Sequence, residues 1–446
     1  MRIHFIAIGG SIMHSLAIAL KQEGHQVTGS DDHIFDPARS RLAAHDLLPD
    51  EGWDSARITS DIEAVILGMH AFEDNPELKR AQELSLPIYS FPEFIYEHSK
   101  QKHRLVIAGS AGKTTVTSMI MHVLKGIDKD VDYLVGAQVK GFDNPVKLSG
   151  APTLLVEGDE YLSSKLDPSP KFLRYHPHLV VLTNISWDHI NVFPSEEVYV
   201  KQFRDLLESL EKAADVIYFE EDKRLKEMVE ELMDPELYYP NPYKTPKAKV
   251  KNGEYILELE GHKKAIKVYG KHNLANIAAA WKVCELLSIE IETFLEHMAT
   301  FEGAQIRLET LHEDAEKMVI RDYAHAPSKV KASVHAVKER YPKKNLIACL
   351  ELHTFSSLNK SFLPHYQGAM DKADHALVYV NPKAIEKRRM EVLSSKDIQQ
   401  AFKNPKLTFV ESPDQIQTFI QEHRVGGDAI LMMSSGDFGG MDLGAV

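Results

Sequence analysis

The fold is decided by residues 106–120, "VIAGSAGKTTVTSMI". The apolar residues at its start predict a buried strand, and those after Thr115 recur at helical spacing and predict an amphipathic helix. Two glycines, a lysine and two threonines lie between these elements. Glycines allow backbone N–H groups to point at a phosphate, and the positive end of a following helix attracts the same anion. The stretch therefore predicts a phosphate-binding loop.

This loop is shorter than the usual G-x-x-x-x-G-K-[ST] pattern when Gly109 is taken as its first glycine. Its chemistry is the same, because Lys113 can neutralise β- and γ-phosphate oxygens and the Thr114 hydroxyl can bind Mg²⁺. The alternative is an ordinary strand-to-helix turn with an incidental lysine. Strand, loop, Lys-Thr-Thr and helix occur in the expected order, which favours the phosphate loop.

Length and composition limit the class of protein. A chain of 446 residues exceeds one ordinary core, so two or three domains are expected. The chain is 43% apolar and 26% charged, and it contains no apolar run near the ~20 residues of a membrane span. The first residues lack a cleavable signal pattern, and the two cysteines, Cys284 and Cys349, are far apart. These features predict a cytoplasmic protein with no membrane partner.

The net charge of −13 argues against a nucleic-acid partner. Binding along a phosphate backbone needs clustered Lys and Arg over a broad face, and an acidic chain does not supply it. A small anionic ligand needs only a few local donors, so it is compatible with this charge.

Short β-branched runs alternate with amphipathic helical stretches, the pattern of parallel sheets with crossover helices. Residues 1–100 predict a Rossmann-like domain, residues 101–300 a P-loop ATPase-like central domain, and residues 301–446 a second Rossmann-like domain. A polar insert in the central segment, residues 238–270, predicts antiparallel strands joined by a tight turn at Asn252–Gly253. The expected fold class is therefore α/β with three domains.

A glycine pair, Gly9-Gly10, ends the first predicted strand, and Asp31 ends the second. The pair does not satisfy the G-x-G-x-x-G pattern of dinucleotide sites, although an acidic residue at this place can hold a ribose. Two ligand classes fit the arrangement: a nucleotide diphosphate or sugar nucleotide, and NAD(P). The missing third glycine disfavours NAD(P).

Charged side chains follow two further predicted strands. Glu157, Asp159 and Glu160 end one of them, and Asp188 and His189 follow the other. The carboxyl ends of strands form the crevice where open α/β sheets bind ligands, so these side chains are candidate Mg²⁺ ligands beside the phosphate loop. A surface acidic turn or a hydrogen-bonded structural histidine is the alternative for either group.

In the third segment, Arg307 precedes an Asp-x-x-His sequence closed by proline, "DYAHAP" at 322–327. Arg307 fits either a surface salt bridge or an arginine that a mobile domain brings to a γ-phosphate.

Together these motifs resemble those of the ATP-dependent Mur ligases, the amide-forming enzymes of peptidoglycan synthesis, over essentially the whole chain. The family patterns G-T-[HN]-G-K-T-[TS], E-A-D-E and T-N-x-x-x-D-H correspond to "GSAGKTT", "EGDE" and "TNISWDH". The patterns G-x-H-N-x-x-N, F-x-G-x-x-R-R-x-E and D-[DY]-A-H-x-P correspond to "GKHNLANIAAA", "FEGAQIRLE" and "DYAHAP". Six matches in the same order make a chance similarity implausible.

The resemblance implies that ATP phosphorylates the lactyl carboxylate of UDP-N-acetylmuramate, with Mg²⁺ as cofactor, and that a peptide or amino-acid acceptor then attacks the acyl phosphate. It implies catalytic roles for Lys113, His189 and Arg307, and Mg²⁺ ligation by Thr114, Glu157 and His189. The implied ATP-binding residues are Gly109, Ser110, Ala111, Gly112, Lys113, Thr114, Thr115, His272, Asn273, Asn276, Arg307 and Asp322. The implied binding residues for the other substrates are Gly9, Gly10, Ser11, Met13, His14, Asp31 and His325. The chain is expected to act as a monomer or homodimer.

Within the family, residues 156–194 and the terminal stretch "SSGDFGG" (434–440) resemble the branch that joins UDP-N-acetylmuramate to L-alanyl-γ-D-glutamyl-meso-diaminopimelate in peptidoglycan recycling. The alternative acceptor is free L-alanine, as in de novo synthesis. Two loops, residues 351–360 and 380–389, are expected to face the acceptor. The second contains cationic donors suited to the carboxylates of a tripeptide, although a solvated helix face fits them equally well: Lys383, Lys387, Arg388 and Arg389.

Three positions depart from the family pattern. Ala111 stands where the family has His or Asn, Ile306 replaces the first of two arginines, and Ala326 stands where a second His is common. Ala111 removes a side chain beside the phosphates but leaves the backbone loop. A binding or regulatory protein with a degenerate nucleotide site is therefore a further alternative, which ATP turnover with a muramyl substrate would exclude.

Overall fold

The computed structural model describes residues 1–446 except 70, 165, 191 and 252–253, and the side chains of residues 387 and 445 also lie outside the description. The chain forms two compact units. The first unit contains residues 1–185 and 201–243, and the second contains residues 186–200 and 244–446. Segment 186–200 therefore belongs to the second unit, although the chain on both sides of it belongs to the first.

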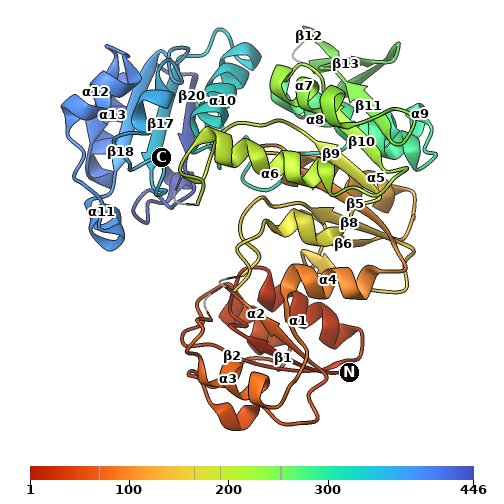
Figure 1. Ribbon diagram of the computed structural model, residues 1–446. Helices are drawn as coiled ribbons and strands as arrows, with labels where there is room; N and C mark the ends of the chain where they lie inside the picture. The colour runs from red at the N-terminus through yellow and green to blue at the C-terminus, as the bar shows by residue number, and fades with distance from the viewer. Residues whose placement is uncertain (70, 165, 191, 252–253) are drawn as a thin grey trace. The chain divides into compact units, whose positions relative to one another are not determined.

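The N-terminal part of the first unit is a four-stranded parallel sheet in the order β2-β1-β3-β4 (Figure 1). β1 lies between β2 and β3 and is buried from Ile3 onward, as the apolar start of the chain predicts. The strands are β1 (Arg2–Ile6), β2 (Gln26–Ser30), β3 (Ala64–Leu67) and β4 (Ile88–Ser90). The helices are α1 (Met13–Gln22), α2 (Ala38–Ala44), α3 (Pro76–Glu83) and α4 (Phe91–Ser99).

A seven-stranded sheet in the order β11-β10-β9-β5-β8-β6-β7 forms the rest of the first unit. β5, the strand before the phosphate-type loop, lies in parallel between β8 and β9, with Ile107 opposite Glu157 and Val181. The strands are β5 (His103–Ala108), β6 (Asp132–Leu134), β7 (Val146–Lys147), β8 (Thr153–Glu157), β9 (Leu179–Leu182), β10 (Asp215–Phe219) and β11 (Tyr239–Tyr243). The helices are α5 (Lys113–Gly126) and α7 (Lys223–Leu232), and α6 (Glu196–Glu208) contributes residues 201–208 to this unit.

The polar insert agrees with its prediction in part. β12 (Lys247–Lys251), β13 (Glu254–Leu259) and β14 (His262–Ile266) form the predicted antiparallel sheet, and the Asn252–Gly253 turn lies outside the described residues. β11 differs, because it pairs in parallel with β10 at the edge of the seven-stranded sheet. An edge strand leaves one row of N–H groups unpaired, which explains how Pro240 and Pro242 can lie within it.

The second unit contains a six-stranded sheet in the order β15-β16-β20-β17-β18-β19. β15 pairs antiparallel with β16, and the other pairs are parallel, so the carboxyl ends of β16, β20, β17 and β18 meet at one edge. We call this the C-terminal edge. The strands are β15 (Glu309–Glu313), β16 (Lys317–Asp322), β17 (Leu346–Leu352), β18 (His375–Val380), β19 (Leu407–Val410) and β20 (Asp428–Met433). The helices of this unit are α8 (Lys271–Leu286), α9 (Ile291–Met298), α10 (Pro327–Arg340), α11 (Pro382–Arg388), α12 (Ser395–Phe402) and α13 (Pro413–His423).

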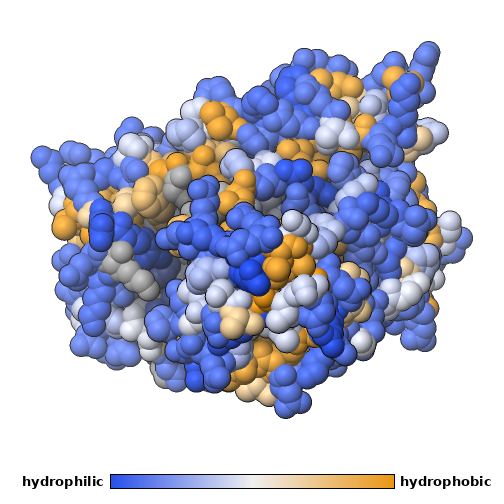
Figure 2. Space-filling model, turned by 60° about the horizontal axis from the view of Figure 1, so that its bottom comes forward, coloured by the Kyte–Doolittle hydropathy of each residue, from blue (hydrophilic) through white to orange (hydrophobic). Residues whose placement is uncertain are grey.

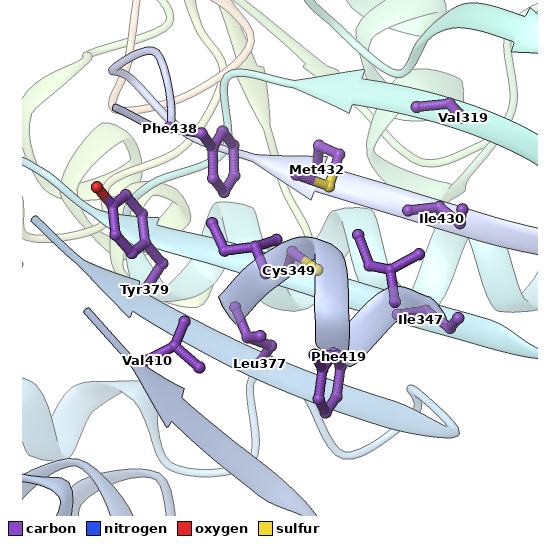
Figure 3. Close-up of a cluster of buried hydrophobic side chains, with 12 residues drawn as sticks. Val319, Ile347, Cys349, Leu377, Tyr379, Val410, Phe419, Ile430, Met432 and Phe438 are labelled. Atoms are coloured by element: carbon purple, nitrogen blue, oxygen red, sulfur yellow. The ribbon is translucent and has the colours of Figure 1, made fainter. Parts of the chain in front are cut away.

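The core of this sheet reaches into the end of the chain. Phe419 of α13 clusters with buried apolar residues of the strands, and Figure 3 shows Tyr379 and Phe438 at one end of this cluster. Their rings stack with centroids 6.3 Å apart. Phe438 belongs to the terminal stretch 434–440, so apolar packing fixes that stretch to the C-terminal edge.

Hydrophilic residues cover most of the face drawn in Figure 2, with smaller patches of apolar residues between them. Across the described part of the chain, no helix is both long and apolar enough to cross a membrane. Parallel-rich sheets alternating with helices confirm the predicted α/β class.

Candidate functional site

The phosphate-type loop between β5 and α5 depends on two glycines in the left-handed region. Gly109 has a φ of +128° and Gly112 a φ of +89°. A Cβ on Gly109 would lie 2.0 Å from Oγ1 of Thr183, so no larger residue fits there. Gly112 caps α5, which begins at Lys113, and the first N–H groups of a helix have no partner within it. The loop therefore provides the backbone donors that an anion needs.

Two residues of the "TNISWDH" sequence clamp this loop. Asn184 accepts hydrogen bonds from the Ala111 N–H through its side-chain oxygen (2.9 Å) and from the Ser110 N–H through its carbonyl oxygen (3.1 Å). The Thr183 hydroxyl donates to the Ala111 carbonyl at 2.5 Å. Sequence reasoning missed these roles because it considered only the Asp and His of the motif. The contacts at Ala111 use backbone atoms alone, which explains why alanine is compatible with an intact loop.

The Lys113 ammonium is held against the loop. Its Nζ donates to the Gly109 carbonyl (2.7 Å) and to Oε2 of Glu160 (2.6 Å). Burial alone would lower the pKa of Lys113, but the negative charges of Glu160, Asp159 and Glu157 raise it above its ordinary value. The lysine therefore stays fully charged beside the backbone donors.

Thr114 and Glu157 form a pair of oxygen donors next to this lysine. The Thr114 hydroxyl donates to Oε1 of Glu157 at 2.8 Å, and the Gly136 N–H donates to Oε2 at 2.8 Å. Hydroxyl and carboxylate oxygens are ligands that Mg²⁺ shares with phosphates and waters, so the pair fits this ion. Within the described ranges, no three His, Cys, Asp or Glu side chains are grouped to hold a metal. His189, the third predicted ligand, belongs to the second unit.

Asp188 and His189 lie near the start of α10 in the second unit. Nζ of Lys329 lies 3.1 Å from Oδ2 of the buried Asp188. Burial alone would raise the pKa of Asp188, but the charges of Lys329, His189 and His325 hold it far below its usual range. Burial and the charge of Lys329 lower the pKa of His325 to about 4. The structure thus brings the predicted His189 and His325 into one cluster with Lys329, which the sequence analysis missed.

The segment around Asp188 also contacts the residues that follow β17. The Ile190 N–H donates to Oγ of Ser356 at 3.3 Å. The Trp187 ring packs edge-on against Phe362 and His365, with ring centroids 5.7 and 5.6 Å apart. Residues 186–190 and the loops after β16 and β17 therefore form one continuous part of the C-terminal edge.

Arg307 contacts the ring of Tyr323, and Asp322 is the residue directly before that tyrosine. The Arg307 guanidinium carbon lies 4.6 Å from the centre of the Tyr323 ring, a cation–π distance. The buried Asp322 carboxylate accepts hydrogen bonds from the Ser333 hydroxyl (2.6 Å) and the Ala324 N–H (3.2 Å), and burial raises its pKa. Protein groups thus bond both oxygens of Asp322, and its contact with a ribose stays a prediction.

The residues predicted to face an adenine lie in the first two turns of α8. The Asn273 amide donates to the Tyr269 carbonyl at 2.9 Å, and the Asn276 amide donates to Oδ1 of Asn273 at 3.4 Å. Burial lowers the pKa of His272 to about 4, so its imidazole is neutral at neutral pH. Neutral amides and a neutral imidazole suit a nucleobase better than a phosphate.

The glycine pair after β1 forms a second loop in the first unit. The Gly9 N–H donates to Oδ2 of Asp31 at 2.8 Å, and Nδ1 of His14 bonds the Gly10 carbonyl at 2.9 Å. Burial, with the neighbouring carboxyl of Asp32, raises the pKa of Asp31 to about 6. Of the predicted binding residues, Gly9, Gly10 and Ser11 lie in the loop before α1, and Met13 and His14 are the first two residues of that helix.

Three family models match the chain in order and together span most of it. The model described as "Mur ligase family, catalytic domain" matches residues 2–103. The model described as "Mur ligase middle domain" matches residues 107–284, and "Mur ligase, glutamate ligase domain" matches residues 306–436. The three matches confirm the predicted three-domain architecture.

Among curated proteins, the UDP-N-acetylmuramate–L-alanine ligase of Clostridium kluyveri is 28% identical over 447 residues, which cover 98% of this chain and 96% of that protein. The enzyme of the same name from Limosilactobacillus reuteri is 29% identical over 448 residues, which cover 97% of this chain and 96% of that protein. The similarity therefore runs the length of both chains.

Solved structures share this fold. A murein peptide ligase from Psychrobacter arcticus aligns with 100% of this chain and 99% of its own, with a TM-score of 0.66 and 21% identity. A UDP-N-acetylmuramate–alanine ligase from Thermotoga maritima aligns with 98% of this chain and 96% of its own, with a TM-score of 0.73 and 21% identity. Two chains with different named acceptors thus share this fold, so the fold does not distinguish between acceptors.

Proposed function

Because the chain belongs to the Mur ligase family of ATP-dependent, ADP-forming amide ligases, we propose that it joins UDP-N-acetylmuramate to L-alanyl-γ-D-glutamyl-meso-diaminopimelate. The observation that carries the nucleotide part of the proposal is the charged Lys113, held 2.7 Å from the Gly109 carbonyl in a glycine loop before α5. The acceptor part is supported by the terminal stretch 434–440, whose sequence resembles that of the recycling branch and whose Phe438 is fixed in the core.

In the first step, the lactyl carboxylate attacks the γ-phosphorus of ATP, and ADP leaves. Such a transfer depends on positioning and charge neutralisation more than on covalent help from the protein. Lys113 supplies one positive charge at the phosphates. Thr114 and Glu157 are the residues that would hold Mg²⁺, which adds charge neutralisation at the β- and γ-phosphates. Arg307, packed over Tyr323, is the second cation that we assign to the γ-phosphate.

In the second step, the acceptor amine attacks the acyl phosphate. The new C–N bond forms, the C–O bond to the phosphate breaks, and inorganic phosphate leaves. An acyl phosphate reacts readily with water, so the protein must limit solvent access until the amine arrives.

Free L-alanine is the second candidate acceptor. The curated relatives from Clostridium kluyveri and Limosilactobacillus reuteri are both named as L-alanine ligases, which favours this activity. The cationic loop predicted at 380–389 does not decide the matter, because most of it forms helix α11 and the side chain of Lys387 lies outside the described residues. A cytoplasmic location and a monomeric or homodimeric state remain predictions from the sequence.

A panel of amine acceptors tests the proposal. With ATP, Mg²⁺ and UDP-N-acetylmuramate, phosphate release should show a much higher kcat/KM for the tripeptide than for L-alanine. A preference for L-alanine would place the chain in the de novo activity. No phosphate release with any acceptor would instead favour the degenerate nucleotide-binding protein that Ala111 and Ile306 leave open.

A further inference from the structure

The end of β17 carries a carboxylate and an imidazole to which the reaction described above gives no role. Glu351 lies within the strand and is fully buried, and His353 directly follows the strand and is partly exposed. Nδ1 of His353 lies 3.6 Å from Oε1 of Glu351. Both atoms are buried, and neither has a hydrogen-bond partner among the residues that the structure describes. An unpartnered buried carboxylate oxygen is costly, so the pair requires an explanation.

The other oxygen of Glu351 is fully used. Oε2 accepts a hydrogen bond from the Phe438 N–H at 2.9 Å and another from the Ser434 hydroxyl. A Cβ on Gly436 would lie 2.7 Å from Nδ1 of His353 and 2.8 Å from Oε2 of Glu351. The terminal stretch 434–440 therefore packs tightly against Glu351 and His353 at Gly436. Its hydrogen bonds to Oε2 keep Oε1 of Glu351 directed toward His353.

The loop that carries His353 is rigid and lies beside the predicted reaction residues. The Thr354 N–H donates to Oγ of Ser357 at 2.9 Å, and the Ser357 N–H donates to Oγ1 of Thr354 at 3.1 Å. Ser356 of the same loop accepts the hydrogen bond from Ile190, two residues after Asp188. His353 is thus fixed at the C-terminal edge that also holds the Asp188 cluster.

We propose that His353 is the base that takes a proton from the acceptor amine, and that Glu351 is a positioning residue for its imidazole. A carboxylate facing Nδ1 favours the tautomer with hydrogen on Nδ1 and the lone pair on Nε2. The Nδ1–Oε1 separation is slightly longer than a hydrogen bond, as catalytic contacts often are before substrate binds. The inference rests on the proposed ligase function and names the group that completes its second step.

The acceptor enters as a neutral amine after its ammonium has lost one proton to solvent. Its nitrogen forms the C–N bond to the acyl carbon and then carries an excess proton, which passes to Nε2 of His353. The C–O bond to the phosphate breaks, and the phosphate leaves with that electron pair. His353 returns its proton to solvent, and Glu351 stabilises the intervening imidazolium.

Hydroxylamine separates this role from the rest of the reaction. It is neutral at neutral pH and a strong nucleophile, so it should trap the acyl phosphate as a hydroxamate without a protein base. With ATP and UDP-N-acetylmuramate, His353→Gln should form hydroxamate at the wild-type rate. With the amine acceptor, the kcat of His353→Gln should fall by about 10²- to 10⁴-fold, while its KM changes little.

Three further variants sharpen the result. Glu351→Gln should also lower kcat with the amine and leave hydroxamate formation unchanged. His375→Gln is the matched control, because His375 lies at the opposite end of the same sheet, where it contacts His423, and both rates should stay at wild-type values. Added imidazole should restore part of the lost amide formation to His353→Ala, which a purely structural histidine would not allow.

The outcomes are distinguishable. Equal losses of hydroxamate and amide in His353→Gln would mean a structural role and would overturn the inference, as would wild-type amide formation. If the wild-type protein forms no hydroxamate at all, the proposed ligase function fails and the inference fails with it. Because hydroxamate formation requires an intact nucleotide site, it also reports whether each variant is folded.

Discussion

Two loops in the first unit share one plan and differ in charge. Each follows an inner strand that is parallel to both of its neighbours, and each precedes a helix: Gly9–Gly10 before α1, and Gly109–Gly112 before α5. In the first loop the Gly9 N–H donates to the Asp31 carboxylate, whereas in the second a lysine lies against the backbone. Glycines supply the N–H groups in both, so the side chains beside the loop decide how much negative charge it can accept. We therefore expect a triphosphate at the second loop and a less charged nucleotide diphosphate at the first.

The largest effect is expected from removing the cation that distinguishes the two loops. Lys113→Ala should lower turnover by about 10²- to 10³-fold, because charge stabilisation of the transferred phosphoryl group is lost. Phosphate release in a folded variant measures this. Lys125→Ala is the matched control, since Lys125 lies at the far end of the same helix and donates to the Gly141 carbonyl. Near-normal turnover of Lys113→Ala would mean that the second loop works like the first, through backbone groups alone.

The next effect concerns the metal. Glu157→Ala should raise the Mg²⁺ concentration needed for half-maximal activity by about 10- to 100-fold, because Thr114 alone would remain of the donor pair. Titration of activity with Mg²⁺ measures the change. Glu97→Ala, which removes an exposed ion pair with Lys100, should leave the requirement unchanged. An unchanged requirement in Glu157→Ala would remove Glu157 from the metal site.

A smaller effect is expected at the first loop. The pKa of Asp31 is raised to about 6 in the folded protein, so the carboxyl is neutral below that pH and repels a diphosphate above it. The KM for UDP-N-acetylmuramate should therefore rise severalfold between about pH 5 and pH 7 in the wild type, and remain flat in Asp31→Asn. Initial rates at a series of pH values measure this. Equal slopes for both proteins would show that another group near the loop controls binding.

The same carboxyl affects stability. Because its folded pKa is raised above the reference value of 3.8, its contribution to the free energy of unfolding is present below about pH 4 and is lost as the pH rises through about 6. Asp31→Asn should consequently gain in Tm relative to the wild type at neutral pH, and the gain should be smaller at low pH. Thermal unfolding at both pH values checks the sign.

The smallest effect concerns Ala111. Ala111→His should raise turnover severalfold if an imidazole orients phosphate or metal, with a smaller change in the KM for ATP, because the contacts of residue 111 with Thr183 and Asn184 use its backbone. Steady-state kinetics with ATP as the varied substrate separate the two parameters. Unchanged turnover in the folded variant would make the departure from the family pattern neutral.

Local sequence patterns predicted the elements that hold the loops. The apolar run before Gly109 forms β5, and the helix after it begins at Lys113, as the spacing indicates. The positions of Glu157 at the end of β8 and of Asp188 beyond β9 were likewise readable, because the carboxyl ends of parallel strands collect polar residues. These features depend on neighbours close in sequence, and periodicity encodes them.

Contacts between distant segments were not predictable in this way. Lys329 pairs with Asp188 across 141 positions, and Glu351 accepts from Phe438 across 87. The first depends on how the segment around Asp188 packs against α10, and the second on the pairing of β17 with β20. No local pattern specifies either arrangement. The parallel pairing of β11 with β10 was missed for the same reason, because the sequence of the insert does not specify which sheet its first strand joins.

The division of the chain into two discontinuous units also limits which fragments and chimeras of this protein keep their contacts. The backbone passes from one unit to the other at 185/186, 200/201 and 243/244, so neither unit is a continuous segment. A fragment that begins at residue 244 would leave Lys329 without Asp188 and Ser356 without Ile190. The two units therefore cannot be exchanged with those of a relative by one crossover. A working chimera must therefore take residues 186–200 and residues 244–446 from the same parent protein.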